Sequence, residues 1–386
     1  MEQMLKRTWA EIDLDALSHN YETLRRRAGT KMLGVVKADA YGHGALWVGR
    51  TLEKLGAAYL AVANLDEARE LRKGGITAPI LIFGHTPEEY VPLLIAHRIT
   101  QTVSCEAKAA AYSQAAAACG GTLQVHLKVD TGMSRLGFLC AAEQFEEGVA
   151  AAVRSCALPN LHVEGIFTHF AVSDETDAES EAFTREQYDL FCRFVSALEA
   201  RGISFALRHC ANSGAVANYP EMALDMVRPG ILLYGCGQGA ERLGLRPVMR
   251  LKTAVSTIKT LPAGTSVSYG RTYRTKAPTR LGVLPIGYAD GLLRCLSNRC
   301  AFYAGDGIAP QLGRICMDMC MVDLTDRPEV QVGSEVEIFG IHNRADKLAD
   351  IAGTIPYELT CAVNKRVPRV FLKDGKAVGT ELRMYL

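Results

Sequence analysis

Short apolar runs alternate with segments of helical periodicity over the first 240 residues of the chain. The runs are dense in Val, Ile and Leu, which is typical of strands buried on both faces. Leu65–Lys73 and Ala107–Ala118 are two of the intervening helical segments. The eight runs are Met32–Val36, Tyr59–Ala63, Pro79–Phe83, Ile99–Val103, Leu123–Val129, Val163–Phe167, Ser204–His209 and Met226–Leu233. Eight strand–helix units in about 240 residues predict a parallel (β/α)8 barrel of the TIM type.

An open, doubly wound sheet is the alternative for this pattern. It normally carries a Gly-x-Gly-x-x-Gly motif after its first strand, and the chain has none there. Beyond Ala240 polar and apolar positions alternate between Gly, Pro and Asp turns, which indicates β structure. We expect strands at Leu251–Leu261, Leu281–Pro285, Met317–Leu324 and Glu335–Phe339. The sequence thus predicts an α/β protein with a barrel over residues 1–240 and a mainly-β domain over 241–386, against which the first residues also pack.

Composition excludes several classes of partner. Hydrophobic residues make up 48% and charged residues 22% of the 386 residues, as in ordinary globular proteins. The net charge is +1 with scattered basic residues, so we expect neither a nucleic-acid nor a membrane partner. No apolar run approaches the roughly 18 residues of a spanning helix, and the first residues lack the apolar core of a signal peptide. The 12 cysteines are widely spaced, which predicts reduced thiols in a cytoplasm and no metal site.

Lys37 is the first candidate for chemistry. It ends the first apolar run and opens the stretch Lys-Ala-Asp-Ala-Tyr-Gly-His-Gly. An amine at a strand end is suited to pyridoxal phosphate (PLP), which needs one to form a Schiff base. A lone lysine there is more often a solvated surface residue, although the glycines that follow let a ligand approach the backbone. This stretch by itself does not choose between the two interpretations.

Other predicted strands also end in polar residues. Because barrel active sites lie at the C-terminal strand ends, we expect these groups to meet in one pocket. They are Lys128, Asp130 and Arg135 after the fifth run, His169 after the sixth, His209, Asn212 and Ser213 after the seventh, and Arg228 in the eighth. Each alone could be a surface or structural residue. Their joint occurrence at several strand ends favours a binding site.

Each group has a physical task around PLP. The phosphate needs hydroxyl and backbone N–H donors, which Ser213, the Gly230–Ile231 backbone, Tyr41 and Tyr357 can provide. Arg228 can face the pyridine nitrogen. Since arginine keeps its proton near neutral pH, the ring nitrogen would stay unprotonated, and reprotonation at the substrate Cα would be favoured over side reactions. The alternative is that Arg228 is a strand-end ion-pair partner.

Seven segments together resemble the alanine racemase family of bacteria. They are Val35–Gly44, His126–Met133, Thr168–Ala171, Met226–Ile231, Ser268–Gly270, Gly287–Gly291 and Gly313–Asp318. The resemblance extends from Trp9 to Phe371 in the order of the family. It implies a fold-type III PLP enzyme with a barrel, a β domain and a head-to-tail homodimer that shares its active sites.

The resemblance also implies individual roles. Lys37 carries the cofactor and is the base on the D-face, and Tyr269 of the partner subunit is the base on the L-face. Arg228 binds the pyridine nitrogen, and His169 hydrogen-bonds Tyr269. Cofactor contacts are implied for Lys37, Tyr41, Arg135, His169, Asn212, Ser213, Arg228, Gly230, Ile231 and Tyr357, and substrate contacts for Arg135, Met317 and Tyr269. Asp174, Tyr288, Arg294, Arg314 and Ile355 match the access corridor of the family, and Lys128 matches a lysine that is carbamylated in many relatives.

Racemisation explains the need for two bases. A proton must leave one face of a planar carbanion and return on the other, and two fixed bases achieve this without movement. A free tyrosine has a pKa of about 10, so a tyrosine base needs neighbours that tune it.

The expected activity is interconversion of L- and D-alanine, which supplies D-alanine for peptidoglycan. The segment Ile355–Glu358 resembles the alanine-type pattern, and Tyr357 narrows the pocket. A serine racemase or a broader amino-acid racemase of the same fold is the alternative. A decarboxylase of similar architecture should offer an acid to the pyridine nitrogen, where this chain has Arg228. A PLP-binding homeostasis protein is usually a single barrel, without the β domain that carries Tyr269.

Overall fold

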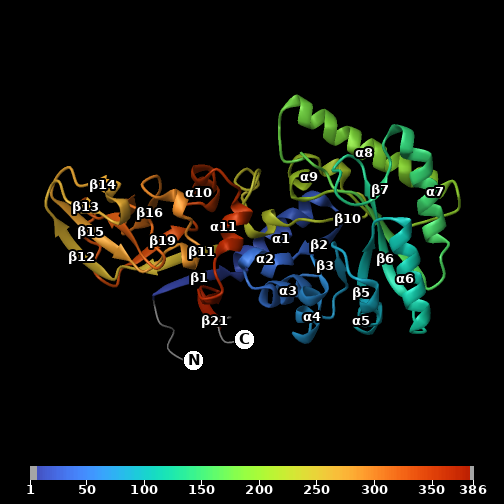
Figure 1. The fold of residues 1–386 in the computed structure, drawn as a ribbon, viewed down its shortest axis with the longest axis horizontal. Helices are drawn as coiled ribbons and strands as arrows, with labels where there is room; N and C mark the ends of the chain where they lie inside the picture. Colours follow the sequence, from blue (N-terminus) through green and yellow to red (C-terminus); the bar gives the residue numbers. More distant parts are fainter. Residues whose placement is uncertain (1–6, 383–386) are drawn as a thin grey trace.

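Parallel strands near the N-terminus form a nearly closed barrel in the computed structural model, which describes residues 7–382 (Figure 1). The strands are β2 (Lys31–Val35), β3 (Tyr59–Val62), β4 (Ile80–Ile82), β5 (Ile99–Val103), β6 (Leu123–Asp130), β8 (Leu161–Phe167), β9 (Leu207–His209) and β10 (Met226–Val227). Their order is β10-β2-β3-β4-β5-β6-β8-β9, with β7 (Phe138–Leu139) beside β6. Between β9 and β10, Asp225 N–H donates to Arg208 O at 3.1 Å and Arg228 N–H to Ala211 O at 2.9 Å. The predicted barrel is confirmed.

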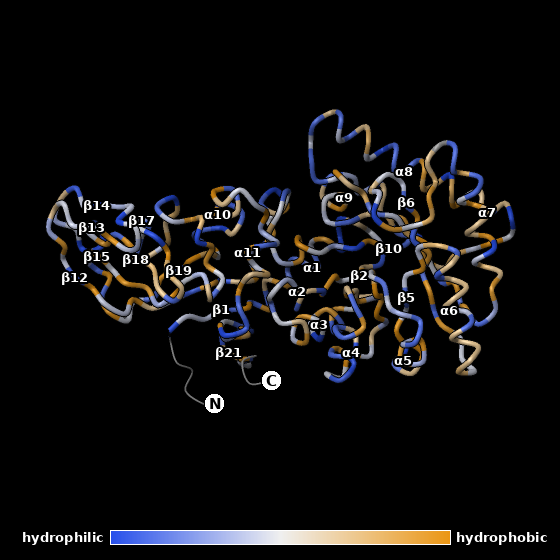
Figure 2. The backbone as a smooth tube through the Cα atoms, in the orientation of Figure 1, coloured by the Kyte–Doolittle hydropathy of each residue, from blue (hydrophilic) through white to orange (hydrophobic). Residues whose placement is uncertain are grey.

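Helices surround the barrel because their apolar faces pack on its strands. They are α1 (Leu14–Ala28), α2 (Lys37–Gly42), α3 (Ala45–Lys54), α4 (Leu65–Lys73), α5 (Val91–Ala96), α6 (Glu106–Ala118), α7 (Phe145–Cys156), α8 (Ala178–Glu199) and α9 (Ser213–Asn218). Local chemistry fixes several starts: Asp13 caps α1, Asn64 caps α4 and Asp177 caps α8 by accepting backbone N–H bonds. Figure 2 shows apolar segments concentrated along the strands, while polar residues are frequent at the outer turns.

The second domain is built on one long mixed sheet, on the left of Figure 1. Its strand order is β12-β15-β18-β17-β16-β19-β11-β1-β20-β21. The strands are β1 (Thr8–Asp13), β11 (Met249–Ala254), β12 (Thr257–Leu261), β15 (Thr279–Leu284), β16 (Ala301–Ala304), β17 (Gly307–Leu312), β18 (Cys320–Asp323), β19 (Glu335–Phe339), β20 (Arg369–Lys373) and β21 (Lys376–Glu381). A small hairpin of β13 (Ser266–Val267) and β14 (Tyr273–Arg274) lies beside it, with α10 (Ala345–Ala352) and α11 (Pro356–Ala362) toward the barrel.

β1 comes before the barrel in sequence but pairs with β11 and β20 of the second domain. Its alternate residues Ala10 and Ile12 are fully buried, which fixes the register because a slip by one residue would expose them. The prediction that the first residues pack against the C-terminal domain also covers residues 1–6, which, like residues 383–386, lie outside the described residues.

Three predicted strands are wrong in their extent. Met226–Leu233 stops at Val227, because Pro229 has no N–H to donate and the chain turns into a 3-10 helix at Ile231–Tyr234. Leu251–Leu261 is two strands, β11 and β12, which pair with different partners. Met317 lies in a turn closed by Cys316 N–H donating to Met319 O at 2.9 Å, so that strand begins only at Cys320.

Candidate active site

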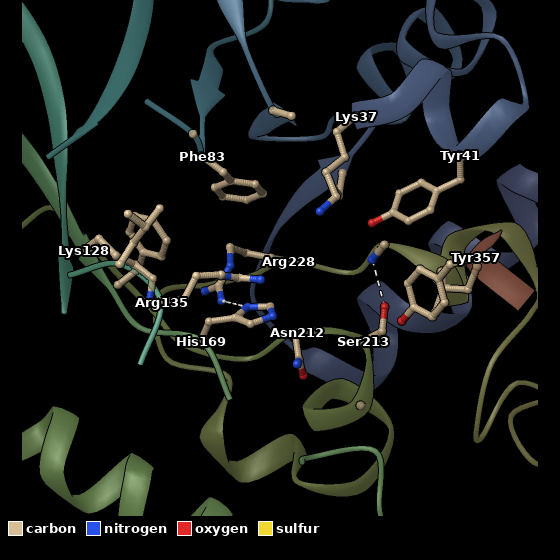
Figure 3. A pocket seen from close by; sticks show the side chains of 18 of the residues that line it. Lys37, Tyr41, Phe83, Lys128, Arg135, His169, Asn212, Ser213, Arg228 and Tyr357 are labelled. Carbon is tan, nitrogen blue, oxygen red and sulfur yellow. Dashed lines mark hydrogen bonds between the residues drawn. The ribbon is translucent and has the colours of Figure 1, made fainter. Parts of the chain in front are cut away.

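A cavity of about 350 Å³ opens at the C-terminal ends of the barrel strands (Figure 3). It lies where the barrel fold places active sites, and its size suits a small cofactor or ligand. Most of the residues singled out from the sequence line it: Lys37, Tyr41, Lys128, Arg135, His169, Asp174, Asn212, Ser213, Arg228, Gly230, Ile231 and Tyr357. Among the described residues no group of three or more His, Cys, Asp or Glu side chains is arranged to hold a metal ion.

Lys37 reaches the cavity through an unusual backbone turn. Ala38 to Tyr41 have φ between +50° and +55°, which is a left-handed turn that costs energy for residues with a Cβ. Glu67 holds the turn from one side by accepting from Ala38 N–H at 2.8 Å and from Ala63 N–H at 2.7 Å. In Figure 3 the Lys37 amine and the Tyr41 ring both lie in the cavity. The turn therefore brings two predicted cofactor contacts, four positions apart, to one space.

The electrostatic setting of Lys37 favours a neutral amine. Burial lowers its pKa from the ordinary value, and the nearby Arg135 guanidinium lowers it further. A neutral amine can attack a carbonyl carbon or take up a proton, whereas the ammonium form can do neither. A lysine at a solvated strand end would keep its ordinary pKa. The lowered pKa of Lys37 therefore favours the cofactor-binding interpretation over a surface lysine.

Arg228 forms the floor of the cavity and is held by four acceptors. Its guanidinium donates to Thr168 O at 2.7 Å and Cys210 O at 3.0 Å, and contacts His209 Nδ1 at 3.1 Å. It also contacts His169 Nδ1 at 3.3 Å (Figure 3). Burial lowers the pKa of Arg228 to about 10, so it stays charged near neutral pH. Burial and the Arg228 charge hold the pKa values of both histidines well below the usual range. Both imidazoles are therefore neutral acceptors.

The arginine rests on a buried chain of polar groups inside the barrel. His209 Nε2 lies 3.0 Å from His126 Nδ1, and His126 Nε2 lies 3.0 Å from the Glu164 carboxylate. Tyr59 donates to the same carboxylate. Glu164 was not among the residues predicted from the sequence, because its place in this chain depends on a bond to His126, 38 positions away.

Ser213 and two glycines form a small cradle at the other end of the cavity. Ser213 Oγ accepts from Gly230 N–H at 2.8 Å (Figure 3). A Cβ on Gly230 would lie 2.5 Å from Tyr41 Oη, and one on Gly214 would lie 2.6 Å from Asp174 N, so both positions require glycine. Tyr357 lies beside Tyr41, with ring centroids 5.7 Å apart. Backbone N–H groups and hydroxyls at this spacing match the donors that a phosphate needs.

The charge of the cavity also fits PLP. Besides Lys37, its lining contains three basic side chains, Lys128, Arg135 and Arg228, against the single acid Asp174. Lys128 donates to Val129 O at 3.0 Å, and burial together with Arg228 lowers its pKa to about 7. An anionic ligand would relieve the repulsion among these cations. A cavity with a reactive amine at one side and a phosphate cradle at the other suits a phosphorylated aldehyde.

Except for Tyr357, the predicted residues of the second domain lie elsewhere in this chain. Tyr269, Met317, Tyr288, Arg294 and Arg314 do not line the cavity, and the first three are exposed by 70%, 54% and 43%. Ile355 lines a neighbouring space of about 870 Å³ that shares Asp174 and Tyr357 with the cavity. One chain thus brings together the predicted cofactor contacts but not the predicted second base.

Comparison with known proteins identifies the family. The models of the alanine racemase N-terminal and C-terminal domains match residues 12–238 and 248–371. The alanine racemase of Desulfovibrio desulfuricans is 46% identical, with 95% of this chain and 98% of that protein aligned. Alanine racemase 1 of Clostridium acetobutylicum is 44% identical, with 99% of both chains aligned.

Solved structures agree with the sequence relatives. The alanine racemase of Clostridium difficile 630 superposes with a TM-score of 0.93 at 37% identity, over 99% of this chain and 100% of that chain. The enzyme of Bacillus anthracis, solved with bound L-Ala-P, superposes with a TM-score of 0.87 at 32% identity over 99% of both chains. The chain belongs to the alanine racemase family, whose members are isomerases that depend on pyridoxal phosphate.

Proposed function

We propose that this protein interconverts L- and D-alanine, with Lys37 and Tyr269 of a partner subunit exchanging protons on opposite faces of bound PLP. The observation that carries the proposal is the Lys37 amine, whose pKa burial and Arg135 lower, in a cavity also lined by Lys128, Arg135 and Arg228. When bound, PLP supplies an aldehyde for the substrate amine and a ring that withdraws electrons from the Cα–H bond. The protein residues then have to hold, take and return a proton at defined atoms.

Lys37 Nζ is the proton acceptor and donor on its side of the cavity. A base works best when its pKa lies near the pH of the reaction, and the lowered pKa of Lys37 moves it in that direction. Arg228 contributes a fixed positive charge at the cavity floor. Its guanidinium is bonded to four acceptors and keeps its proton near neutral pH. It therefore disfavours a second positive charge beside it. The ring nitrogen would stay neutral there, which limits side reactions.

Tyr269 Oη is the proton acceptor and donor on the opposite side, and it comes from the second subunit of a homodimer. Its 70% exposure and its place outside the cavity of its own chain support this assignment, because a catalytic tyrosine must be sheltered in the working enzyme. Met317 is exposed by 54% and would be placed beside the substrate carboxylate in the same way. His169, a neutral imidazole whose Nδ1 accepts from Arg228, would donate its Nε2–H in the hydrogen bond that orients Tyr269.

The substrate choice follows from the size and polarity of the cavity. Tyr357 lies next to Tyr41 on one wall of the cavity and would narrow the space left beside bound PLP, which supports a small substrate such as alanine. Serine is the competing substrate. We place the enzyme in the cytoplasm, where its D-alanine would serve peptidoglycan synthesis. Among the described residues no helix has the length and apolarity needed to cross a bilayer.

A chiral assay with added PLP tests the activity. Starting from L-alanine, the product should approach equal amounts of both enantiomers, and L-serine should react more slowly. Faster turnover of L-serine would favour the serine racemase, and release of carbon dioxide would favour a decarboxylase.

Mixed dimers test the shared site. Lys37→Ala and Tyr269→Phe subunits are each defective, but a hybrid would contain one site with both native residues. Refolding the two variants together should therefore recover up to about a quarter of wild-type activity, the share expected from random pairing of subunits in a C2 dimer. No recovery would show that both residues act within one chain or that no dimer forms.

A further inference from the structure

Three turns of the second domain pack into one unit, which we call the three-turn unit: residues 268–270, 287–291 and 313–318. Ser268 Oγ donates to Arg314 O at 2.6 Å, which joins the first turn to the third. Tyr288 N–H donates to Cys316 O and Ala289 N–H to Met317 O, both at 3.0 Å, which joins the second to the third. A Cβ on Gly287 would lie 2.3 Å from two of these carbonyls. The side chains of Tyr269, Tyr288 and Met317 are thus presented by one connected backbone.

A fully buried carboxylate lies inside this unit. Asp290 has no exposed side-chain surface, and its Oδ2 accepts from Gly287 N–H at 2.9 Å. Its Oδ1 accepts from Arg7 at 3.1 Å and from Arg366 at 2.8 Å. Burial of an unpaired carboxylate is very unfavourable, so the geometry of the turn depends on these two cations.

The two arginines come from other parts of the chain and extend the contact to the third turn. Arg7 lies just before β1, and Arg366 lies between α11 and β20. Arg366 also donates to the Asp318 carboxylate at 2.7 Å, and Arg7 to Asp318 O at 3.4 Å. Two arginines and two carboxylates therefore tie residues 287–291 and 313–318 to the sheet that carries them. None of these four residues lines the Lys37 cavity.

We propose that Asp290 is a positioning residue, which through Arg7, Arg366 and the three-turn unit holds Tyr269 and Met317 in place for the active site of the partner subunit. The inference rests on the proposed function, in which Tyr269 acts in trans. It assigns Asp290 to the neighbour's site, although the residue touches neither cofactor nor substrate. Loss of this anchor shifts the second base relative to the substrate, and shifts of about 1 Å can lower rates by up to ~10²-fold.

Asp290→Asn is the first test, because it keeps the size of the side chain and removes its charge. We expect kcat to fall about tenfold or more, while the absorption band of bound PLP is retained, since no residue of the three-turn unit lines the Lys37 cavity of its own chain. Arg366→Gln removes one of the two cations that pair with Asp290 and should show the same pattern. It replaces the first test if Asp290→Asn does not fold. Asp306→Asn, a matched change at a carboxylate that is 86% exposed, should leave activity unchanged.

Mixed dimers separate positioning in trans from a general defect. With Lys37→Ala subunits, Asp290→Asn subunits should recover activity to the level of the Lys37→Ala and Tyr269→Phe pair, because one hybrid site has native Lys37 and a native three-turn unit. With Tyr269→Phe subunits they should recover nothing, because neither hybrid site is intact.

The outcomes distinguish this inference from the proposal on which it rests. If the Lys37→Ala and Tyr269→Phe pair recovers but Asp290→Asn does not complement Lys37→Ala, the positioning role is overturned alone. Unchanged kcat in Asp290→Asn homodimers overturns it as well. If the Lys37→Ala and Tyr269→Phe pair itself fails, the shared site is wrong and this inference falls with it.

Discussion

The Lys37 cavity and the three-turn unit differ in how complete they are within one chain. Around Lys37 the groups deepest in the cavity are buried and have partners in their own barrel, as the four acceptors of Arg228 show. Around Tyr269 the supporting backbone is equally well bonded, but the side chains at its surface are exposed. One chain thus encloses most of the predicted cofactor contacts, whereas the proposed second base and its neighbours lie exposed on the second domain.

Both regions carry backbone strain that their surroundings hold in place. Ala38 to Tyr41 follow Lys37 in a left-handed turn, and Ser268 and Arg271, on either side of Tyr269 and Gly270, have φ of +65° and +52°. Such conformations cost energy and persist only where neighbouring contacts enforce them. In the first region Glu67 enforces the turn, and in the second the Ser268 bond to Arg314 O does. Each of the two candidate bases therefore lies next to a strained turn that a hydrogen bond holds in place, although the two bases are in different domains.

The largest effect should come from removing the amine of the cavity. Lys37→Ala is expected to lower racemisation by at least about 10³-fold, since it removes a general acid–base group and the cofactor attachment. The absorption band of enzyme-bound PLP should disappear, as measured by ultraviolet–visible spectroscopy. Lys31→Ala, at the exposed opposite end of the same strand, is the control and should retain both. A persistent band together with racemisation in Lys37→Ala would show that another lysine holds the cofactor.

A smaller and asymmetric effect is expected in the second domain. Tyr269→Phe should lower proton abstraction from L-alanine by about 10²-fold and affect abstraction from D-alanine less, because only one face loses its base. Deuterium exchange at Cα, measured from each enantiomer in heavy water, reports the two directions separately. Tyr273→Phe loses a hydroxyl in the neighbouring strand β14 and should behave as wild type. Equal losses in both directions would contradict a base that serves one face.

The smallest expected effect is a pH dependence of the free energy of unfolding, which arises from the buried Lys128 of the cavity. Lys128 has a pKa of about 7 in the folded protein, against about 10.4 when unfolded. Between these values the unfolded chain binds the extra proton, so the cost of burying Lys128 is full below pH 7 and disappears as the pH rises toward 10. Lys128→Met should therefore be more stable than wild type at pH 7.5, and this advantage should shrink by roughly 1–2 kcal/mol at pH 9.

Urea unfolding of the PLP-free protein in carbon-dioxide-free buffer measures that difference, because a carbamate on Lys128 would replace the cation by an anion. Lys276→Met, an exposed lysine of the second domain, is the matched control and should give the same difference from wild type at both pH values. A constant advantage for Lys128→Met would show that the folded lysine keeps its proton up to pH 9, so that its pKa is not lowered, or that the lysine is modified.

Sequence patterns were most informative where one local feature decides the structure. The apolar runs located the barrel strands because parallel strands are buried on both faces. Their ends were harder to predict: Pro229 stops β10 early, and β11 and β12 divide because they join different partners in the sheet. Of the site, the strand-end residues that now line the cavity could be read from the sequence. Glu164 could not, because its significance arises only from its bond to His126.

The sequence by itself determined the two-domain architecture, the lysine at the first strand end and the family, since each depends on periodicity or on contiguous motifs. Only the tertiary structure decided that partial burial and Arg135 lower the pKa of Lys37, that Arg228 faces two neutral histidines, and that Tyr269 lies outside the cavity of its own chain. These properties depend on burial and on the distances between charges that are far apart in sequence. A pattern along the chain records neither, because both arise only when the strands close and the second domain folds around Asp290.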